Sequence, residues 1–206
     1  MKSVVAGKPL LRLASARERI DRTAYELFSR YGVRAVGVDT ISARSGVAKM
    51  TLYRHYPSKK DLALAFLRRR EELWTRSWLQ QEVERLAHTP AARLLAVFDV
   101  FDKWFRRSDF EGCSFIKVLL EHGDRGHPVR NAAEAHIETI RAFLRRLAED
   151  AGVRNADTFA RQLQILMMGS IVAAYAGDED AARRSKEMGL LLLARAGIRT
   201  GKGGQG

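Results

Sequence analysis

The sequence predicts an all-α protein made of a small N-terminal three-helix domain and a larger C-terminal helical domain. Three observations support this fold class. Apolar residues recur at helical spacing through most of the 206-residue chain. Helix caps and glycines divide this pattern into segments of helical length. Positive charge gathers at one end, because residues 1–60 contain 13 Lys and Arg against 4 Asp and Glu, whereas residues 61–206 contain 23 against 20.

The charge distribution limits the function classes. Most of the formal charge of +12 lies in residues 1–60, which is typical of a polyanion-binding module joined to a nearly neutral body. The single cysteine cannot form an intramolecular disulfide. No run approaches the roughly eighteen apolar residues of a membrane span, and residues 1–10 lack the apolar core of a signal peptide. We therefore expect a cytoplasmic protein that makes no membrane contact.

Composition divides the chain into four segments. Residues 1–14 carry several Lys and Arg without helical periodicity, so we expect a disordered basic arm. Residues 15–60 have the pattern of a basic helical domain, and residues 61–197 have the pattern of a larger, nearly neutral helical domain. Residues 198–206 are rich in glycine and are expected to be a disordered tail.

The first predicted helix begins at Ser15 or Ala16 and ends at Gly32. Its apolar residues, including Ile20 and Leu27, lie on one face at helical spacing. This face predicts a supporting role, in which the helix packs beneath the two helices that follow.

Residues 37–61 have the layout of two short helices, a tight turn and a capped third helix, as in a DNA-reading helix-turn-helix. Gly37 or Asp39 can open the first of these helices. Gly46 ends it, because glycine adopts the left-handed turn conformation without the cost of a Cβ atom. The second helix, from Lys49 to His55, begins almost at once.

The short helix from Lys49 to His55 exposes more polar and aromatic groups than a packing helix requires. Only Leu52 and Tyr56 are predicted to face the core. Seven residues cannot form a stable helix alone, so neighbouring elements must brace it. Ser58 and Asp61 have the spacing of a capping box for the next helix, whose N-terminal amides can hold a phosphate together with a lysine.

The run from Ile41 to Lys49 and the run from Thr51 to Leu62 resemble the N-terminal domain of TetR-type transcriptional regulators. The resemblance covers about residues 15–62. It identifies residues 15–60 as the predicted helix-turn-helix DNA-binding domain and residues 61–197 as the predicted effector-binding and dimerisation domain. It implies a homodimer that binds double-stranded DNA, a helical body that binds a small molecule, and a long fourth helix that transmits ligand binding to the DNA-reading heads. Met50 and Asp39 depart from the usual pattern, which leaves the operator sequence open.

The exposed side chains of the helix-turn-helix are the predicted DNA contacts. They are Thr40, Arg44, Lys49, Met50, Thr51, Tyr53, Arg54, His55 and Lys59. Lys49 and Arg54 can donate to guanine edges, and Thr51 can touch a thymine methyl group. Most of the others suit phosphate oxygens. A two-fold dimer would read a palindrome whose half-sites lie about 34 to 36 Å apart, or a multiple of one helical turn.

The helical pattern continues through the C-terminal domain. A long fourth helix is predicted from Ser58 to near Gln81, and Thr89 with Pro90 opens the next one. A short helix ending near His122 follows, and then a long helix spans residues 128–151.

Aromatic, sulfur-containing and histidine side chains gather in these central helices, which suits a mostly apolar cavity with a few polar anchors. The predicted ligand-binding residues are Trp74, Trp78, Phe101, Trp104, Phe105, Phe110, Cys113, Phe115, His122, His136, Met167 and Met168. The sequence does not identify the effector.

The last two predicted helices, about residues 155–176 and 179–196, are the expected partner surface. The first is apolar nearly all round, so both of its faces must be covered. With their symmetry mates, these helices would form a four-helix dimer interface. The predicted interface residues are Phe159, Leu163, Leu166, Ser170, Ala173, Ala174, Met188, Leu191 and Leu192.

The residues also offer two rival functions, an enzyme and a metal or redox sensor, and the sequence leaves open whether Cys113 is only structural or senses oxidation. Cys113 with His122 or His136 could form a nucleophile and base, but the apolar setting of Cys113 and the lack of an oxyanion loop disfavour an enzyme. Cys113, Glu121, His122, His127 and His136 include metal ligands, yet their spacings match no compact metal motif. We therefore expect no cofactor and no metal, and a repressor rather than an activator, because repression requires only that a promoter be blocked.

Overall fold

A computed structural model describes residues 14–199, and every regular element in that range is helical. The all-α prediction is confirmed. The predicted arm (1–14) and tail (198–206) fall almost entirely outside the described residues. No helix in the described range is both long enough and apolar enough to cross a membrane.

The N-terminal head consists of α1 (Ala16–Tyr31), α2 (Val38–Ser45) and α3 (Lys49–His55). Ser15 and Glu18 form a reciprocal capping box at the start of α1. Gly46 ends α2 at φ 64°, in the left-handed conformation that the sequence predicts. Buried side chains from all three helices, such as Ile20, Ile41 and Leu52, meet in one hydrophobic cluster, so α3 is braced by its neighbours.

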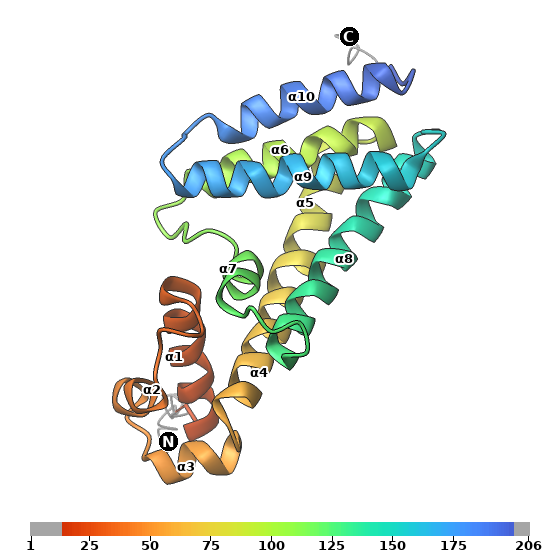
Figure 1. Ribbon diagram of the computed structural model, residues 1–206. Coiled ribbons are helices and arrows are strands. Elements are labelled where there is room, and N and C mark those ends of the chain that lie inside the picture. The colour runs from red at the N-terminus through yellow and green to blue at the C-terminus, as the bar shows by residue number, and fades with distance from the viewer. Residues whose placement is uncertain (1–13, 200–206) are drawn as a thin grey trace, which may run out of the picture.

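A long rod leaves the head and runs diagonally across the molecule (Figure 1). It joins α4 (Lys59–Glu71), the π-helical segment η1 (Glu72–Leu79) and α5 (Gln80–Leu86). Ser58 caps it, since its hydroxyl oxygen accepts a hydrogen bond from the Asp61 amide. The Asp61 carboxylate accepts the Ser58 hydroxyl. The predicted end near Gln81 was too early by one to two turns.

The body contains α6 (Pro90–Phe105), α7 (Ser114–Glu121), α8 (Pro128–Asp150), α9 (Ala156–Tyr175) and α10 (Ala181–Arg195). In Figure 1, α6, α9 and α10 lie together across the far ends of the rod and α8. Their common core contains Leu94, Phe98, Leu144, Leu163 and Leu193, all at most 1% exposed.

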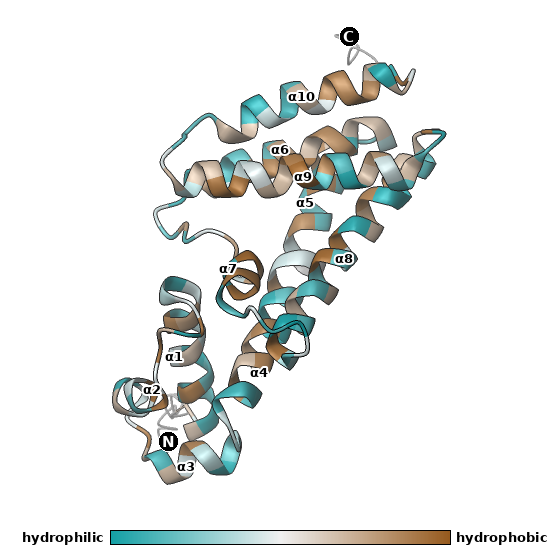
Figure 2. Cartoon of the chain, viewed as in Figure 1, coloured by the Kyte–Doolittle hydropathy of each residue, from teal (hydrophilic) through white to brown (hydrophobic). Residues whose placement is uncertain are grey.

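Helix α7 is the element that joins head and body. It is strongly apolar (Figure 2) and lies between the head and the rod (Figure 1). Phe115 and Val118 of α7, with Val129 and Ala133 of α8, belong to the same hydrophobic cluster as the core of the head. The head therefore packs against the body through side chains and not only through the chain connection.

Candidate DNA-binding surface and ligand cavity

Helix α3 presents one buried and one exposed face. Leu52 is fully buried and Tyr56, the residue that follows the helix, is 5% exposed. On the other side Met50 is 76% exposed, and Tyr53, Arg54 and His55 are exposed as well. Of the three predicted base-reading residues, Lys49 and Arg54 are thus exposed at the tip of the head, whereas Thr51 is half-buried.

Two polar contacts organise this surface. Lys49 Nζ lies 2.6 Å from a carboxylate oxygen of Asp39, and this hydrogen bond raises the pKa of Lys49. Arg54 Nη2 donates to Thr51 Oγ1 at 2.9 Å. As a predicted DNA contact, Lys49 would have to exchange Asp39 for an acceptor on the DNA, whereas the Arg54 guanidinium is already oriented by Thr51.

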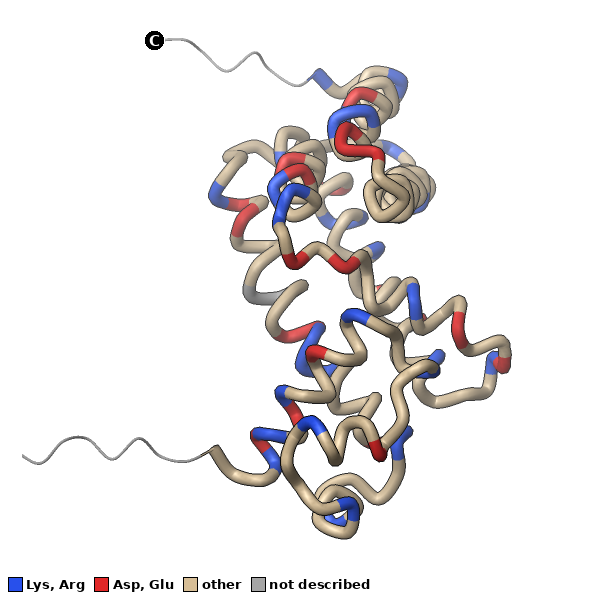
Figure 3. The backbone as a smooth tube through the Cα atoms, turned by 90° about the vertical axis from the view of Figure 1, so that its left-hand side faces the viewer, with Lys and Arg blue, Asp and Glu red and all other residues tan. Residues whose placement is uncertain are grey.

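The predicted phosphate contacts flank α3 on both sides. Thr40 and Arg44 are exposed on α2, and Lys and Arg positions recur through the head in Figure 3. Lys59, at the start of α4, is half-buried and donates to the carbonyl oxygen of Arg34 at 3.2 Å. Burial lowers the pKa of Lys59, against a smaller opposing effect of Glu121. Lys59 is therefore partly engaged within the head rather than free in solution.

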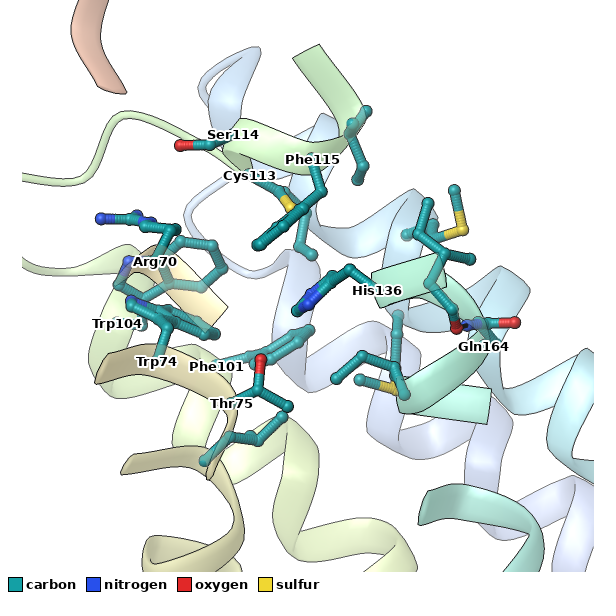
Figure 4. A pocket seen from close by; sticks show the side chains of 17 residues that line it. Arg70, Trp74, Thr75, Phe101, Trp104, Cys113, Ser114, Phe115, His136 and Gln164 are labelled. Carbon is teal, nitrogen blue, oxygen red and sulfur yellow. Dashed lines mark hydrogen bonds between the residues drawn. The ribbon is translucent and has the colours of Figure 1, made fainter. Parts of the chain in front are cut away.

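A small cavity lies inside the body, between η1, α6, α7, α8 and α9 (Figure 4). Its free space is about 60 Å³, and its lining is mostly apolar. Eight of the twelve predicted ligand-binding residues line it: Trp74, Phe101, Trp104, Cys113, Phe115, His136, Met167 and Met168.

The other four predicted ligand-binding residues lie outside the cavity. Trp78, Phe105 and Phe110 extend an aromatic cluster around Trp104, where the Trp104 and Phe110 ring centroids are 4.9 Å apart. His122 lies against His127 beyond the end of α7. Composition alone does not distinguish aromatic residues that fill a core from those that line a hollow.

Sequence reasoning missed nine lining residues, four of them polar and five aliphatic. They are Arg70, Thr75, Leu79, Ser114, Ile116, Ile137, Ile140, Gln164 and Ile171. An available signal was Thr75 between Trp74 and Trp78, since a polar residue on the core side of a helix requires a hydrogen-bond partner.

The cavity contains polar atoms that lack partners. Thr75 Oγ1, Ser114 Oγ and His136 Nδ1 are buried without a hydrogen-bond partner among the described residues. The His136 imidazole stacks on Phe115, with ring centroids 3.4 Å apart. Burial, with a smaller contribution from the Arg70 charge, lowers the pKa of His136 to about 4. His136 is therefore neutral near pH 7.

The structure places the residues that the two rival functions would use. Burial raises the pKa of the Cys113 thiol, so the thiolate that a nucleophile requires is disfavoured. His122, one of the two bases considered for it, lies outside the cavity that Cys113 lines. Within residues 14–199, no three His, Cys, Asp or Glu side chains come together as metal ligands.

Helix α7 also holds the head through polar contacts that the sequence did not reveal. The Glu121 carboxylate accepts hydrogen bonds from the backbone amides of Val33 and Arg34, each at 3.0 Å. Lys117 Nζ donates to the carbonyl oxygens of Ser29 and Arg30 at the end of α1, at 3.0 and 3.2 Å.

Gly32 explains why Glu121 can approach so closely. Its φ of 83° favours glycine, and a Cβ atom there would overlap the Glu121 carboxylate. One helix thus contributes Ser114, Phe115 and Ile116 to the cavity and Lys117 and Glu121 to the head.

The predicted dimer residues separate into two groups. Phe159, Leu163 and Ser170 are at most 4% exposed and pack inside the protomer, so they are not available to a partner. Their burial reflects contacts with α6, α8 and α10, which the all-round apolar pattern of α9 could not distinguish from contacts with a second subunit. Leu166, Ala173, Ala174 and Leu192 are partly exposed, and Met188 and Leu191 are exposed.

The surface of α9 also carries apolar residues outside the predicted set. Ile165 is 69% and Val172 is 54% exposed, and the exposed Gly169 lies between them. These three residues follow helical spacing on one stripe.

Comparisons with known proteins agree with this architecture. Residues 20–66 match the family model of bacterial regulatory proteins of the tetR family, and residues 90–188 match that of the tetracyclin repressor-like C-terminal domain. The chain is 23% identical to the HTH-type transcriptional regulator YjdC of Escherichia coli K12 over 178 residues, which cover 83% of this chain and 91% of YjdC.

Solved structures show the same fold. SCO4454, a TetR-family transcriptional regulator from Streptomyces coelicolor, superposes with a TM-score of 0.79 at 26% identity, over 88% of this chain and 95% of that one. A putative TetR-family regulator (sav143) from Streptomyces avermitilis superposes with a TM-score of 0.79 at 29% identity, over 90% of this chain and all of that one. With both of its domains matched, the chain belongs to the TetR family of DNA-binding transcriptional regulators.

Proposed function

We propose that this protein is a cytoplasmic repressor that binds a palindromic operator as a homodimer and leaves it when a small, largely apolar effector enters the cavity. The observation that carries the proposal is the double role of α7, which forms a wall of the cavity and holds the end of α1. A ligand that displaces α7 must also change how the head is held. No catalytic role is proposed.

DNA recognition would use the exposed face of α3. Arg54 is the best-placed reader, because Thr51 orients its guanidinium and a bidentate Arg to guanine contact distinguishes that base in the major groove. Lys49 would be a second reader. Tyr53, His55 and Lys59 would contact phosphates and set the register of the head on the duplex.

Dimerisation would use α9 and α10. Exposed apolar side chains such as Ile165, Val172, Met188 and Leu191 are unfavourable in water, and the exposed Gly169 permits close helix approach. Packing each pair of helices against its symmetry mate would cover these residues in a four-helix arrangement. The pairing would also fix the distance between the two heads.

Release would follow from a shift between two conformations. The ligand binds best where α7 has moved, and the operator binds best where the heads keep the spacing of its half-sites. Because this coupling is reciprocal, operator binding must weaken effector binding by the same factor.

The proposal is tested by footprinting the purified protein on the DNA upstream of its own coding sequence, together with the molar mass in solution. We expect a protected palindrome, a dimer, and increased transcription of a reporter when the gene is deleted. A monomer that ignores duplex DNA at low salt contradicts the proposal. Reduced transcription after deletion would instead identify an activator.

A further inference from the structure

The size of the cavity limits what it can hold. Its free space of about 60 Å³ is less than the roughly 150 Å³ of an engineered apolar cavity that binds benzene. A single aromatic ring would fit only if the walls move outward, through the flexible side chains of Met167 and Met168 on one side and through α7 on the other. Larger multi-ring compounds would require the helices themselves to separate.

The wall of the cavity is largely aromatic. Phe101, Trp74 and Trp104 approach it from the side of the rod and α6, and Phe115 approaches from α7 (Figure 4). Aromatic faces and edges favour a planar aromatic guest over a flexible aliphatic one.

Two buried polar atoms face this space without a partner. Thr75 Oγ1 and His136 Nδ1 have no hydrogen-bond partner among the described residues, although Thr75 is fully buried and His136 is 7% exposed. In Figure 4 the Thr75 hydroxyl points to the side of the cavity where the imidazole of His136 and the ring of Phe101 lie. A group that can both donate and accept would satisfy both atoms, whichever nitrogen of the imidazole carries the proton.

The Ser114 hydroxyl lacks a partner too, but it points away from the aromatic side chains of the cavity (Figure 4). We therefore assign the Ser114 hydroxyl no contact with the ligand.

Charge restricts the ligand further. Arg70 is the one charged side chain among the described residues that line the cavity, and no acidic side chain accompanies it there. An organic cation would therefore lose its hydration without gaining a counter-ion. The Arg70 guanidinium points away from Thr75 and His136 (Figure 4), donates to Tyr25 Oη at 2.7 Å and lies over the Tyr25 and Trp74 rings. A carboxylate placed beside Thr75 and His136 would therefore gain no counter-ion there.

We propose that the effector is a small, uncharged, single-ring aromatic compound whose hydroxyl group hydrogen-bonds to His136 and Thr75. This inference rests on the proposed function, because only that function makes the ligand an effector. The chemical class of the ligand is tested without DNA. The hydroxyl would satisfy two polar atoms that the protein leaves unpaired, and the ring would occupy the aromatic part of the cavity.

Isothermal titration calorimetry with four ring probes of similar size tests the proposal on the full-length protein. The probes are p-cresol, toluene, p-toluate and 4-methylbenzylammonium. We expect p-cresol to bind about tenfold more tightly than toluene, because its hydroxyl satisfies buried groups that toluene leaves unpaired. The two charged probes should bind more weakly than p-cresol.

Two variants locate the hydroxyl. His136→Phe keeps a ring that can stack on Phe115 but lacks the nitrogen, and Thr75→Val keeps the shape but lacks the hydroxyl. Each should lower p-cresol affinity and bring it towards that of toluene, while toluene affinity stays nearly unchanged. His122→Phe, outside the cavity, is the matched control and should behave as the wild type.

Equal affinities for p-cresol and toluene would overturn the proposal, as would tighter binding of either charged probe or an unchanged preference in both variants. If the protein protects its operator but takes up no ring probe, the ligand class fails and the repressor function stands. If p-cresol binds as expected but no upstream DNA is protected, the ligand class stands and the repressor function fails.

Discussion

Lowering the pH from 7 to 5 should destabilise the protein by about 2 kcal/mol through His136 alone. The pKa of this side chain is about 4 in the folded protein and 6.5 in its ordinary state. Between these values the unfolded chain binds a proton that the folded chain does not, so the free energy of unfolding falls as the pH falls. The contribution is nearly complete at pH 7 and is lost through the window from 6.5 to 4.

The magnitude follows from the size of the shift. One pKa unit corresponds to about 1.36 kcal/mol, so the difference between 6.5 and about 4 gives roughly 3 kcal/mol over the whole window. About 2 kcal/mol of this falls between pH 7 and pH 5. His136 is only 7% exposed, so solvent screening reduces the value little.

Urea unfolding of the wild type and of His136→Phe, at pH 7 and pH 5 and at one protein concentration, measures this contribution. The variant cannot take up the proton, so it should lose about 2 kcal/mol less than the wild type between the two pH values. Other titrating groups act on both proteins and cancel in the difference. If the free energy of unfolding falls by the same amount in both proteins, the pKa of His136 is the same in the folded and unfolded states. The conclusion that burial keeps this imidazole neutral would then be wrong.

Three further changes test the DNA-binding surface, the dimer and the link between the cavity and the head. Arg54→Ala should cost about 1 to 3 kcal/mol of operator affinity and relax base preference at one position per half-site in binding-site selection, whereas Lys59→Ala should weaken binding to all sequences alike and flatten the salt dependence. Equal losses on specific and random DNA for Arg54→Ala would remove it as a reader. Val172→Glu should yield a monomer by sedimentation with unchanged helix content, because the side chain is exposed in the protomer; a persistent dimer would exclude this face of α9. The ratio of operator affinity without effector to that with effector should be at least roughly fivefold smaller in Glu121→Gln than in the wild type. An unchanged ratio would remove Glu121 from the coupling.

The helices of the head were predictable because residues close together in the sequence determine where each helix begins and ends. Ser15 with Glu18 at one end and Gly32 at the other define α1, and Gly46 ends α2 in the left-handed conformation. Each signal acts within a few residues, so it does not depend on how the rest of the chain packs. The division of α3 into buried Leu52 and exposed neighbours followed from the same local reasoning.

The body was less predictable because its details depend on long-range packing. The π-helical segment Glu72–Leu79 widens a helix that the apolar spacing predicts to be regular. Phe159 and Leu163 are buried within the protomer because other helices of the same chain cover α9. An apolar residue in the sequence does not show whether α10 or a second subunit will cover it. The Glu121 contacts join residues 87 and 88 positions apart, and no local pattern marks them.

The small cavity and the intact contacts of α7 together indicate which of the two proposed states the structure resembles. A ligand-filled cavity would have to be larger than about 60 Å³, and α7 cannot move outward while Glu121 and Lys117 hold the end of α1 and the residues after it. The structure therefore resembles the state without effector. In the proposed mechanism, enlarging the cavity and keeping these contacts would be competing demands on one eight-residue helix, and this competition would couple effector binding to operator binding.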